Sequence, residues 1–202
     1  MALADSICSD DLNVIEYPKR AYEMLGPFKM GGLTGMGAFA HHVPADGAVF
    51  VFYGLHIGVS RAGVPGDVLR PGQSTLSACR GAAKAALDRL LRGEIQPGHI
   101  TKLDYQQNTI EQIFLAQGPR ILAAANPIVE ATEVMYEAIE ARIDLLASRT
   151  IYPCRYVILL GAVLINADPE VGAFASHRRL HVLDSATGTH ESLLAELLAT
   201  HA

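Results

Sequence analysis

Long apolar segments alternate with helix-like segments along most of the chain. The runs "AVFVFYGLHIGV" (48–59) and "RYVILLGAVLIN" (155–166) are continuously apolar and rich in β-branched residues, which predicts two buried strands. Shorter patterns predict further strands at 5–8 and 178–185. Strands that alternate with helices favour an α/β fold, with a mostly parallel central sheet flanked by helices on both faces.

The predicted helices lie between these strands and have recognisable ends. The segment "STLSACRGAAKAALDRLLRG" (74–93) is the clearest, with Ser74 or Ser77 as an N-terminal cap and Gly93 as its terminator. A turn-rich loop precedes it at 63–74. The other predicted helices are 17–25, a zone over 107–149 interrupted at Gly118-Pro119 and Asn126-Pro127, and 190–201.

Composition indicates one domain with a large core. The chain has 202 residues, of which 50% are hydrophobic and 18% charged, and we expect a single domain over 1–202. The mean hydropathy of +0.22 is high for a soluble monomer, which predicts a subunit interface and a homodimer or higher homo-oligomer. The net charge of -5 gives no electrostatic reason to expect nucleic acid as a partner.

No segment is expected to enter a membrane. The most apolar run, at 156–167, is shorter than the roughly 18–20 residues that a spanning helix needs. The N-terminus lacks the basic and apolar regions of a secretory signal, so a cytoplasmic protein is expected. The odd count of three cysteines then favours free thiols or metal ligands over disulfides.

Three metal-binding residue types fall where ligands gather in a parallel sheet. Cys8 ends the first strand, His56 lies at the end of the second, and Cys79 lies near the start of the alanine-rich helix. Two thiolates and one imidazole would leave a fourth position open on tetrahedral zinc, as in catalytic sites. The spacing Cys-x47-His-x22-Cys is not a compact zinc motif, and each residue alone could simply be part of the core.

Four segments give the chain a family resemblance. "ICSDDL", "GGLTGMGAFAHHVP", "YGLHIGV" and "SACRGA", between about residues 7 and 90, resemble the low-CO2-inducible B/C (LCIB-like) family of algae and its bacterial relatives. That family is similar to β-carbonic anhydrases, which implies an α/β fold, a dimeric unit and zinc held by Cys8, His56 and Cys79. Asp10 falls on the acid of the family's Cys-x-Asp motif.

The sequence departs from standard β-carbonic anhydrases at two points. Leu12 stands where they carry an arginine, and 22 residues separate His56 from Cys79 where they have a His-x-x-Cys motif. Both departures fit the low-CO2-inducible branch better. They leave open which arginine keeps Asp10 from binding the metal itself. We expect Arg80, beside the zinc cysteine, with Arg20 and Arg61 as weaker candidates.

The resemblance implies reversible hydration of carbon dioxide to bicarbonate by zinc-bound hydroxide. Asp10 would accept a hydrogen bond from the water, and His42, preferred to His41, would relay its proton. The apolar residues predicted to surround the carbon dioxide are Phe39, Phe52, Tyr53 and Leu55.

Two alternatives stay open. One is a catalytically silent zinc protein that binds or senses inorganic carbon or acts as an assembly partner. The other is a metal-free hydrolase with Cys79 as nucleophile and His56 as base.

Overall fold

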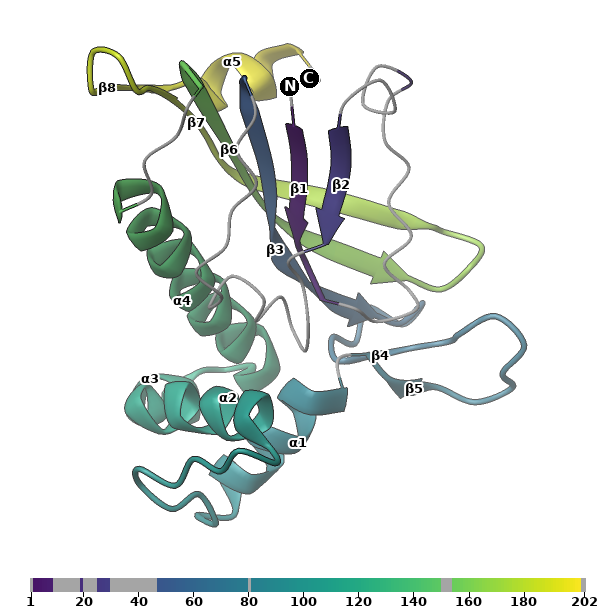
Figure 1. The fold of residues 1–202 in the computed structure, drawn as a ribbon. Helices are drawn as coiled ribbons and strands as arrows, with labels where there is room; N and C mark the ends of the chain where they lie inside the picture. Colours follow the sequence, from purple (N-terminus) through teal and green to yellow (C-terminus); the bar gives the residue numbers. More distant parts are fainter. Residues whose placement is uncertain are drawn as a thin grey trace.

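The fold is built around one six-stranded sheet with the strand order β2-β1-β3-β6-β7-β8 (Figure 1). A computed structural model describes residues 2–8, 19, 25–29, 47–79, 81–149 and 154–200. The strands are β1 (Ala2–Ser6), β2 (Leu25–Lys29), β3 (Val49–Val59), β4 (Asp67–Val68), β5 (Ser77–Ala78), β6 (Tyr156–Ala167), β7 (Ala173–Asp184) and β8 (Thr189–Ser192). The helices are α1 (Gly81–Leu91), α2 (Tyr105–Ala116), α3 (Gly118–Ala123), α4 (Pro127–Arg149) and α5 (Leu194–Thr200).

The centre of the sheet is parallel, which confirms the predicted fold class. Strand β3 pairs in parallel with β1 on one side and with β6 on the other, and β1 pairs in parallel with β2. The β3–β6 register runs from Val49 opposite Val157 to Val59 opposite Ala167. These two strands are the continuous apolar runs of the sequence. Strand β3 is buried on both faces, which explains why it does not alternate with polar residues.

The two strands beyond β6 are antiparallel, so the sheet is mostly but not entirely parallel. Strand β7 pairs antiparallel with β6, and β8 pairs antiparallel with β7. The cause is the short connection after β6, where the Val171 amide donates to the Asp168 carbonyl at 2.8 Å. A connection of this length can join only antiparallel neighbours, because a parallel crossover needs a dozen or more residues.

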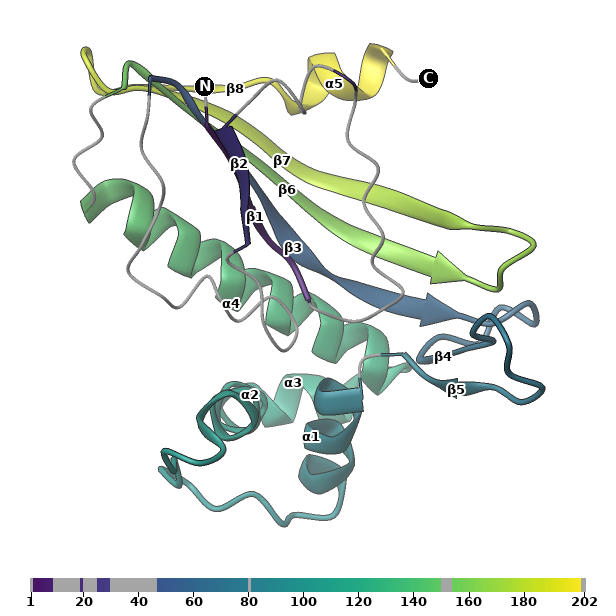
Figure 2. The ribbon, with the colours of Figure 1, turned by 45° about the vertical axis from the view of Figure 1, so that its right-hand side comes forward.

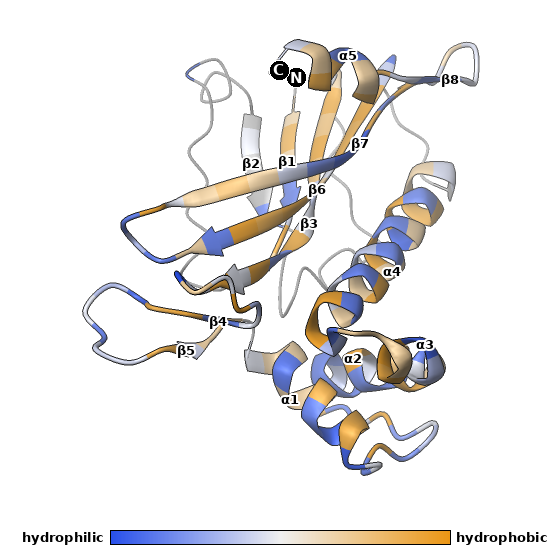
Figure 3. Ribbon diagram, turned by 180° about the vertical axis from the view of Figure 1, so that it is seen from behind, coloured by the Kyte–Doolittle hydropathy of each residue, from blue (hydrophilic) through white to orange (hydrophobic). Residues whose placement is uncertain are grey.

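Helix α4 covers one face of the sheet and forms the main core with it (Figure 1). Its buried residues Met135 and Ile139 belong to the same apolar cluster as Val51, Tyr53 and Leu55 of β3. The hydropathy colouring shows polar positions on the side of α4 turned away from the strands (Figure 3). Helices α1–α3 continue the layer beyond α4, whereas α5 lies on the other side of the sheet near β7 and β8 (Figure 2).

Helix boundaries were predicted well where proline and glycine mark them. The zone predicted over 107–149 is α2, α3 and α4, with breaks beside Gly118-Pro119 and Asn126-Pro127. Amides in the first turn of a helix have no hydrogen-bond acceptor within the helix. Proline, which has no amide proton, therefore begins a helix without penalty. In the described part of the chain, no helix combines the length and apolar character that a membrane span requires.

Several predicted elements need correction. The first strand, predicted at 5–8, is β1 over Ala2–Ser6, so Cys8 lies beyond its end. The helix predicted at 17–25 ends on Leu25, which instead begins β2; residues 17–24, apart from Lys19, lie outside the described residues. Gly26 and Pro27 are tolerated in β2 because it is an edge strand. The first part of the segment 190–201 is β8, and only Leu194–Thr200 is helical.

The alanine-rich helix begins later than predicted. Helix α1 starts at Gly81, whereas Ser77 and Ala78 form β5 and pair with β4. The amide of Cys79 donates to the carbonyl of Gly66 at 3.0 Å, so this segment is held in a hairpin. A hydrogen bond across thirteen residues thus overrides the local capping signal of Ser74 and Ser77.

Candidate metal centre

His56 lies on the face of β3 that is turned away from α4. The odd-numbered residues of β3 pack into the α4 core, whereas Phe52 belongs to a separate apolar cluster with Ile7 and Ala162. His56 has the same parity as Phe52, near the carboxyl end of the strand, and its side chain is fully buried. Ligands gather at this edge of a parallel sheet, as expected from the sequence.

The β4–β5 hairpin brings Cys79 to the same place. The amide of Gly66 donates a hydrogen bond to the carbonyl of Gly58 at 2.8 Å. The carbonyl of Gly66 in turn accepts a hydrogen bond from the amide of Cys79. The hairpin therefore folds back onto the end of β3. Sγ of Cys79 thereby lies 3.2 Å from Nδ1 of His56, and both residues are buried.

Gly58 makes this approach possible. A Cβ atom at Gly58 would lie 2.4 Å from Cβ of Cys79 and 3.1 Å from its sulfur. Since Gly58 and His56 lie on the same face of β3, the missing side chain leaves the space in which Cys79 sits beside the imidazole.

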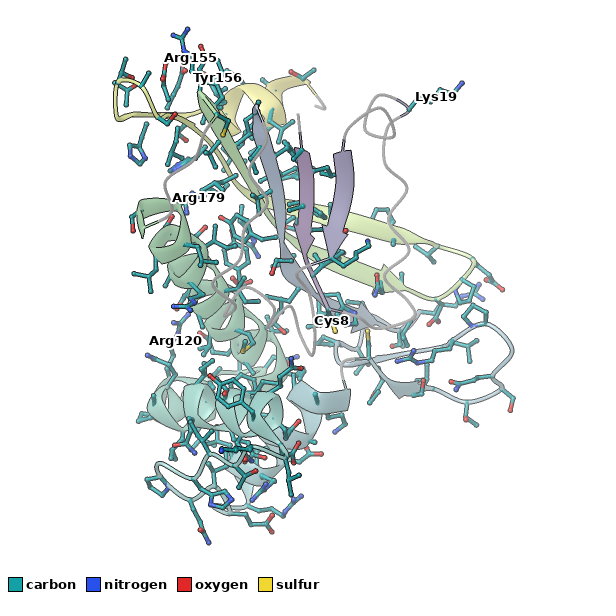
Figure 4. All side chains as sticks on the ribbon, viewed as in Figure 1. Cys8, Lys19, Arg120, Arg155, Tyr156 and Arg179 are labelled. Carbon is teal, nitrogen blue, oxygen red and sulfur yellow. The ribbon has the colours of Figure 1, made fainter. Side chains whose placement is uncertain are left out.

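Cys8 lies at the same edge of the sheet, two residues beyond the end of β1 (Figure 4). Strand β1 runs parallel to β3 with Ser6 opposite Tyr53, and Cys8 is buried. Within the described residues, no group of three or more His, Cys, Asp or Glu side chains is arranged to hold a metal ion. The structure thus brings together His56 and Cys79, and the three-ligand set including Cys8 stays a prediction.

The surroundings of His56 fit a soft metal ion. Asn166 of β6 is buried and places Nδ2 at 2.9 Å from Nδ1 of His56, so the amide and the sulfur of Cys79 both approach one nitrogen. One ring nitrogen has a single in-plane position, which cannot serve both neighbours at once. A sulfur and an imidazole nitrogen bound to one tetrahedral zinc lie about 3.5 Å apart, close to the separation found here.

The same geometry does not match a nucleophilic cysteine. In cysteine hydrolases the thiol contacts one ring nitrogen and an orienting residue holds the other. In this protein both Cys79 and Asn166 contact Nδ1 of His56. Cys79 is also only 1% exposed, so its sulfur is not open to a bulky substrate.

Several predicted site residues lie outside the described residues: Asp10, Arg20, His41, His42 and Arg80. Arg61 is described, and its Nη1 donates to the Glu170 carboxylate at 3.2 Å in an exposed ion pair. Of the residues predicted to surround carbon dioxide, Tyr53 and Leu55 belong to the α4 core. Only Phe52 among the described ones lies on the face that carries His56.

Two residues near the site were not singled out from the sequence. Asn166 contacts His56, and the Asp168 carboxylate accepts the amides of Leu69 at 2.8 Å and Arg61 at 3.0 Å. Both follow the apolar run of β6 at its carboxyl end, in "LINADPE". Polar residues at the carboxyl end of a buried parallel strand are the sequence feature that could have identified them as site residues.

Comparisons with known proteins agree on one family. Residues 1–184 match the limiting CO2-inducible proteins B/C beta carbonic anhydrases. The crystal structure of PtLCIB4, a homolog of the limiting CO2-inducible protein LCIB, is similar with a TM-score of 0.73 and 26% identity, covering 95% of this chain and 84% of that one. The crystal structure of LCIB itself has a TM-score of 0.62 and 15% identity, covering 95% and 82% of the two chains, and it shows the shared fold alone.

No curated protein sequence is significantly similar to the chain. The family match extends over most of its length and agrees with the architecture of the sheet. The chain therefore belongs to the limiting CO2-inducible B/C family of beta carbonic anhydrases.

Proposed function

We propose that the protein is a zinc-dependent carbonic anhydrase, a lyase that interconverts carbon dioxide and bicarbonate. The observation that carries the proposal is the buried contact of 3.2 Å between Sγ of Cys79 and Nδ1 of His56. It lies at the carboxyl edge of the parallel strands in a chain of the beta carbonic anhydrase-like family. PtLCIB4 and LCIB share this fold.

His56 and Cys79 would hold the zinc ion, with Cys8 as the third protein ligand. Zinc, when bound, lowers the pKa of a coordinated water to about 7 and so supplies a nucleophile near neutral pH. The burial of His56 and Cys79 keeps bulk water from competing with these side chains for the metal ion. A thiolate and a neutral imidazole are also the protonation states that zinc binding requires.

The face of the sheet around His56 suits an apolar substrate. Leu164 of β6 lies opposite His56, and Phe52, Ala162 and Leu164 belong to one apolar cluster. Carbon dioxide carries no charge and gains from such a surface, whereas bicarbonate is better solvated by water. The chain's own contribution would be to hold the substrate beside the zinc ligands.

The residues that handle the proton follow from the sequence. Asp10 would accept a hydrogen bond from the water and orient it, Arg80 would pair with Asp10 and prevent it from binding zinc, and His42 would relay the proton. If Asp10 bound zinc instead, the open position would be lost. The protein would then be a silent zinc protein.

Metal analysis and a carbon dioxide hydration assay on the same preparation test the proposal. We expect one zinc ion per chain and stopped-flow hydration well above the uncatalysed rate. Cys79→Ser should lose both, because two remaining ligands hold zinc weakly. Cys154→Ser is the matched control, since Cys154 is also a buried free cysteine but contacts the carbonyl of Tyr156, at the far end of β6 from Asn166.

Each outcome has a distinct meaning. Zinc without hydration would indicate the silent zinc protein that senses or binds inorganic carbon. Wild-type protein without zinc, or Cys79→Ser with full zinc content, would contradict the assignment of the metal centre. Loss of zinc in Cys154→Ser as well would show that the effect of Cys79→Ser is not local.

A further inference from the structure

A cavity of about 800 Å³ lies between the second half of α4 and strands β6, β7 and β8. Its wall includes Leu159, which belongs to the core under α4, so the cavity lies on the face of the sheet opposite to His56. Asp144 of α4 and His181 of β7 also line it. Apolar packing between helix and strands is incomplete here, so polar contacts take a larger share in holding them together.

Arg179 of β7 is the side chain that joins the strands to α4 beside this cavity (Figure 4). Its Nη1 donates to Oδ1 of Asp144 at 2.7 Å and lies 3.8 Å from Oε1 of Glu140. The Arg179 side chain is only 13% exposed, so solvent and salt screen these ion pairs less than pairs on the open surface. Glu140 also accepts the hydroxyls of Tyr53 and Tyr136, which connects Arg179 to the buried contact between β3 and α4.

His181 contacts this guanidinium through a nitrogen that carries no proton. Nη2 of Arg179 lies 2.9 Å from Nδ1 of His181. A guanidinium keeps its charge and can only donate, so Nδ1 of His181 is the acceptor. An imidazolium ion has a proton on both ring nitrogens. Protonation of His181 therefore removes the acceptor and places a second positive charge against Arg179.

The charged groups around His181 act in both directions on its protonation. Asp144 and Glu140 on α4 favour the imidazolium ion, whereas Arg179 on β7 and His190 on β8 disfavour it. Burial is the largest influence, and together with Arg179 it lowers the pKa of His181 below the ordinary value of 6.5. The neutral ring is thus the form that the folded chain favours.

We propose that the contact between β7 and α4 is an acid-sensitive switch: protonation of His181 breaks its hydrogen bond with Arg179 and loosens the second half of α4 on the strands. The switch does not rest on the proposed function, because it lies on the other face of the sheet from His56 and uses none of the proposed zinc ligands.

The pH range of the switch follows from the sign of the shift. The unfolded chain takes up this proton near the ordinary pKa of 6.5, and the folded chain takes it up only at lower pH. The stability that neutral His181 contributes is therefore complete above that value. It is lost as the pH falls from 6.5 through the lower pKa of the folded state.

An NMR titration of the imidazole signals tests the protonation of His181. We expect its midpoint in the folded wild type to lie below the midpoint of the histidines in the urea-unfolded chain. His181→Asn identifies the signal by its loss. This variant places an amide near the position of Nδ1, where its oxygen can accept from Arg179 without being able to gain a proton.

Hydrogen exchange at pH 7 and pH 5, each divided by the intrinsic rate at that pH, tests the loosening. One linked proton lowers the protection of amides 141–149 of α4 by up to about tenfold for each pH unit between the two pKa values. Amides of α2 should keep their protection. The loss in α4 should vanish in His181→Asn and persist in His99→Asn, the matched control at an exposed histidine.

Three results would overturn the switch. They are a His181 midpoint at or above that of the unfolded chain, equal protection of α4 at pH 7 and pH 5 in the wild type, and a wild-type acid response in His181→Asn. If His181→Asn fails to fold, His181→Gln replaces it, and the wild-type imidazole titration and α4 exchange must share one midpoint. None of these measurements needs a metal ion, so a protein without zinc or hydration activity would contradict the proposed function alone.

Discussion

The absent side chain of Gly58 leaves the space that Cys79 occupies beside His56. A Cβ atom there would lie 2.4 Å from Cβ of Cys79, which forces the hairpin away from β3. Overpacking of this kind costs about 1–3 kcal/mol, and it acts on the distance between the two donors. Gly58→Ala is therefore expected to weaken zinc binding about 10- to 100-fold, a value measured by chelator competition.

Gly118→Ala is the control for Gly58→Ala. A Cβ atom at Gly118 would meet only Cδ1 of Leu90, at an ordinary contact distance of 3.5 Å. We expect zinc affinity to stay at the wild-type value in this variant. Unchanged zinc affinity in Gly58→Ala would mean that Cys79 does not need its observed place beside His56.

The contact between β3 and α4 includes a buried pair of tyrosines. The hydroxyls of Tyr53 and Tyr136 both donate to Oε1 of Glu140, at 3.0 and 2.9 Å. A Cβ atom at Gly161, on the neighbouring strand, would lie 2.3 Å from Oη of Tyr136, so glycine is required there. Burial raises the pKa of both tyrosines, and the Glu140 carboxylate raises the pKa of Tyr53 further.

These shifts predict how the protein responds to alkali. The folded state keeps Tyr53 and Tyr136 protonated above their ordinary pKa of 10.0, whereas the unfolded chain loses these protons near that value. Their contribution to stability is thus complete below pH 10 and is lost as the pH rises above it. We expect tyrosinate absorbance from these two residues to develop only with unfolding, monitored in parallel by circular dichroism.

Tyr53→Phe and Tyr136→Phe identify the two residues in that titration. Each should remove part of the late absorbance step. Ionisation of Tyr53 and Tyr136 while the circular dichroism signal stays native would contradict the buried arrangement.

At the scale of elements, local signals predicted what local forces determine. The apolar runs of β3 and β6 and the breaks between α2, α3 and α4 follow from burial and from glycine and proline. The start of α1 was predicted too early and β2 was not predicted, because pairing with distant segments decides both. The hydrogen bond from Cys79 to Gly66 and the position of β2 at the edge of the sheet are such cases.

The candidate site was predictable to the same extent. His56 and Cys79 were identified because chemically suitable residues fell at the ends of predicted elements, and the structure brings them together. Asn166 and Asp168 were not identified, because a single asparagine or aspartate at the end of a strand is common. The contact of Asn166 with His56 depends on the register of β6 against β3, and the sequence alone does not set that register.

At the scale of the whole molecule, the candidate metal centre lies where several distant segments converge. The end of β1 carries Cys8, the predicted third ligand, β3 carries His56, the hairpin β4–β5 leads into Cys79, and Asn166 of β6 contacts His56. Because the proposed ligands come from separate elements, β1, β3 and the β4–β5 hairpin must come together before a metal ion can be held. Metal binding should therefore stabilise the folded chain as a whole.

The most direct measurement is zinc X-ray absorption on the purified, metal-loaded protein. With Cys8, His56 and Cys79 as ligands, we predict two sulfur atoms at about 2.3 Å and one imidazole nitrogen at about 2.0–2.1 Å, with one further light atom from solvent. Cys79→Ser should leave a single sulfur if any zinc is retained. A zinc environment without sulfur, or one unchanged by Cys79→Ser, would contradict the account.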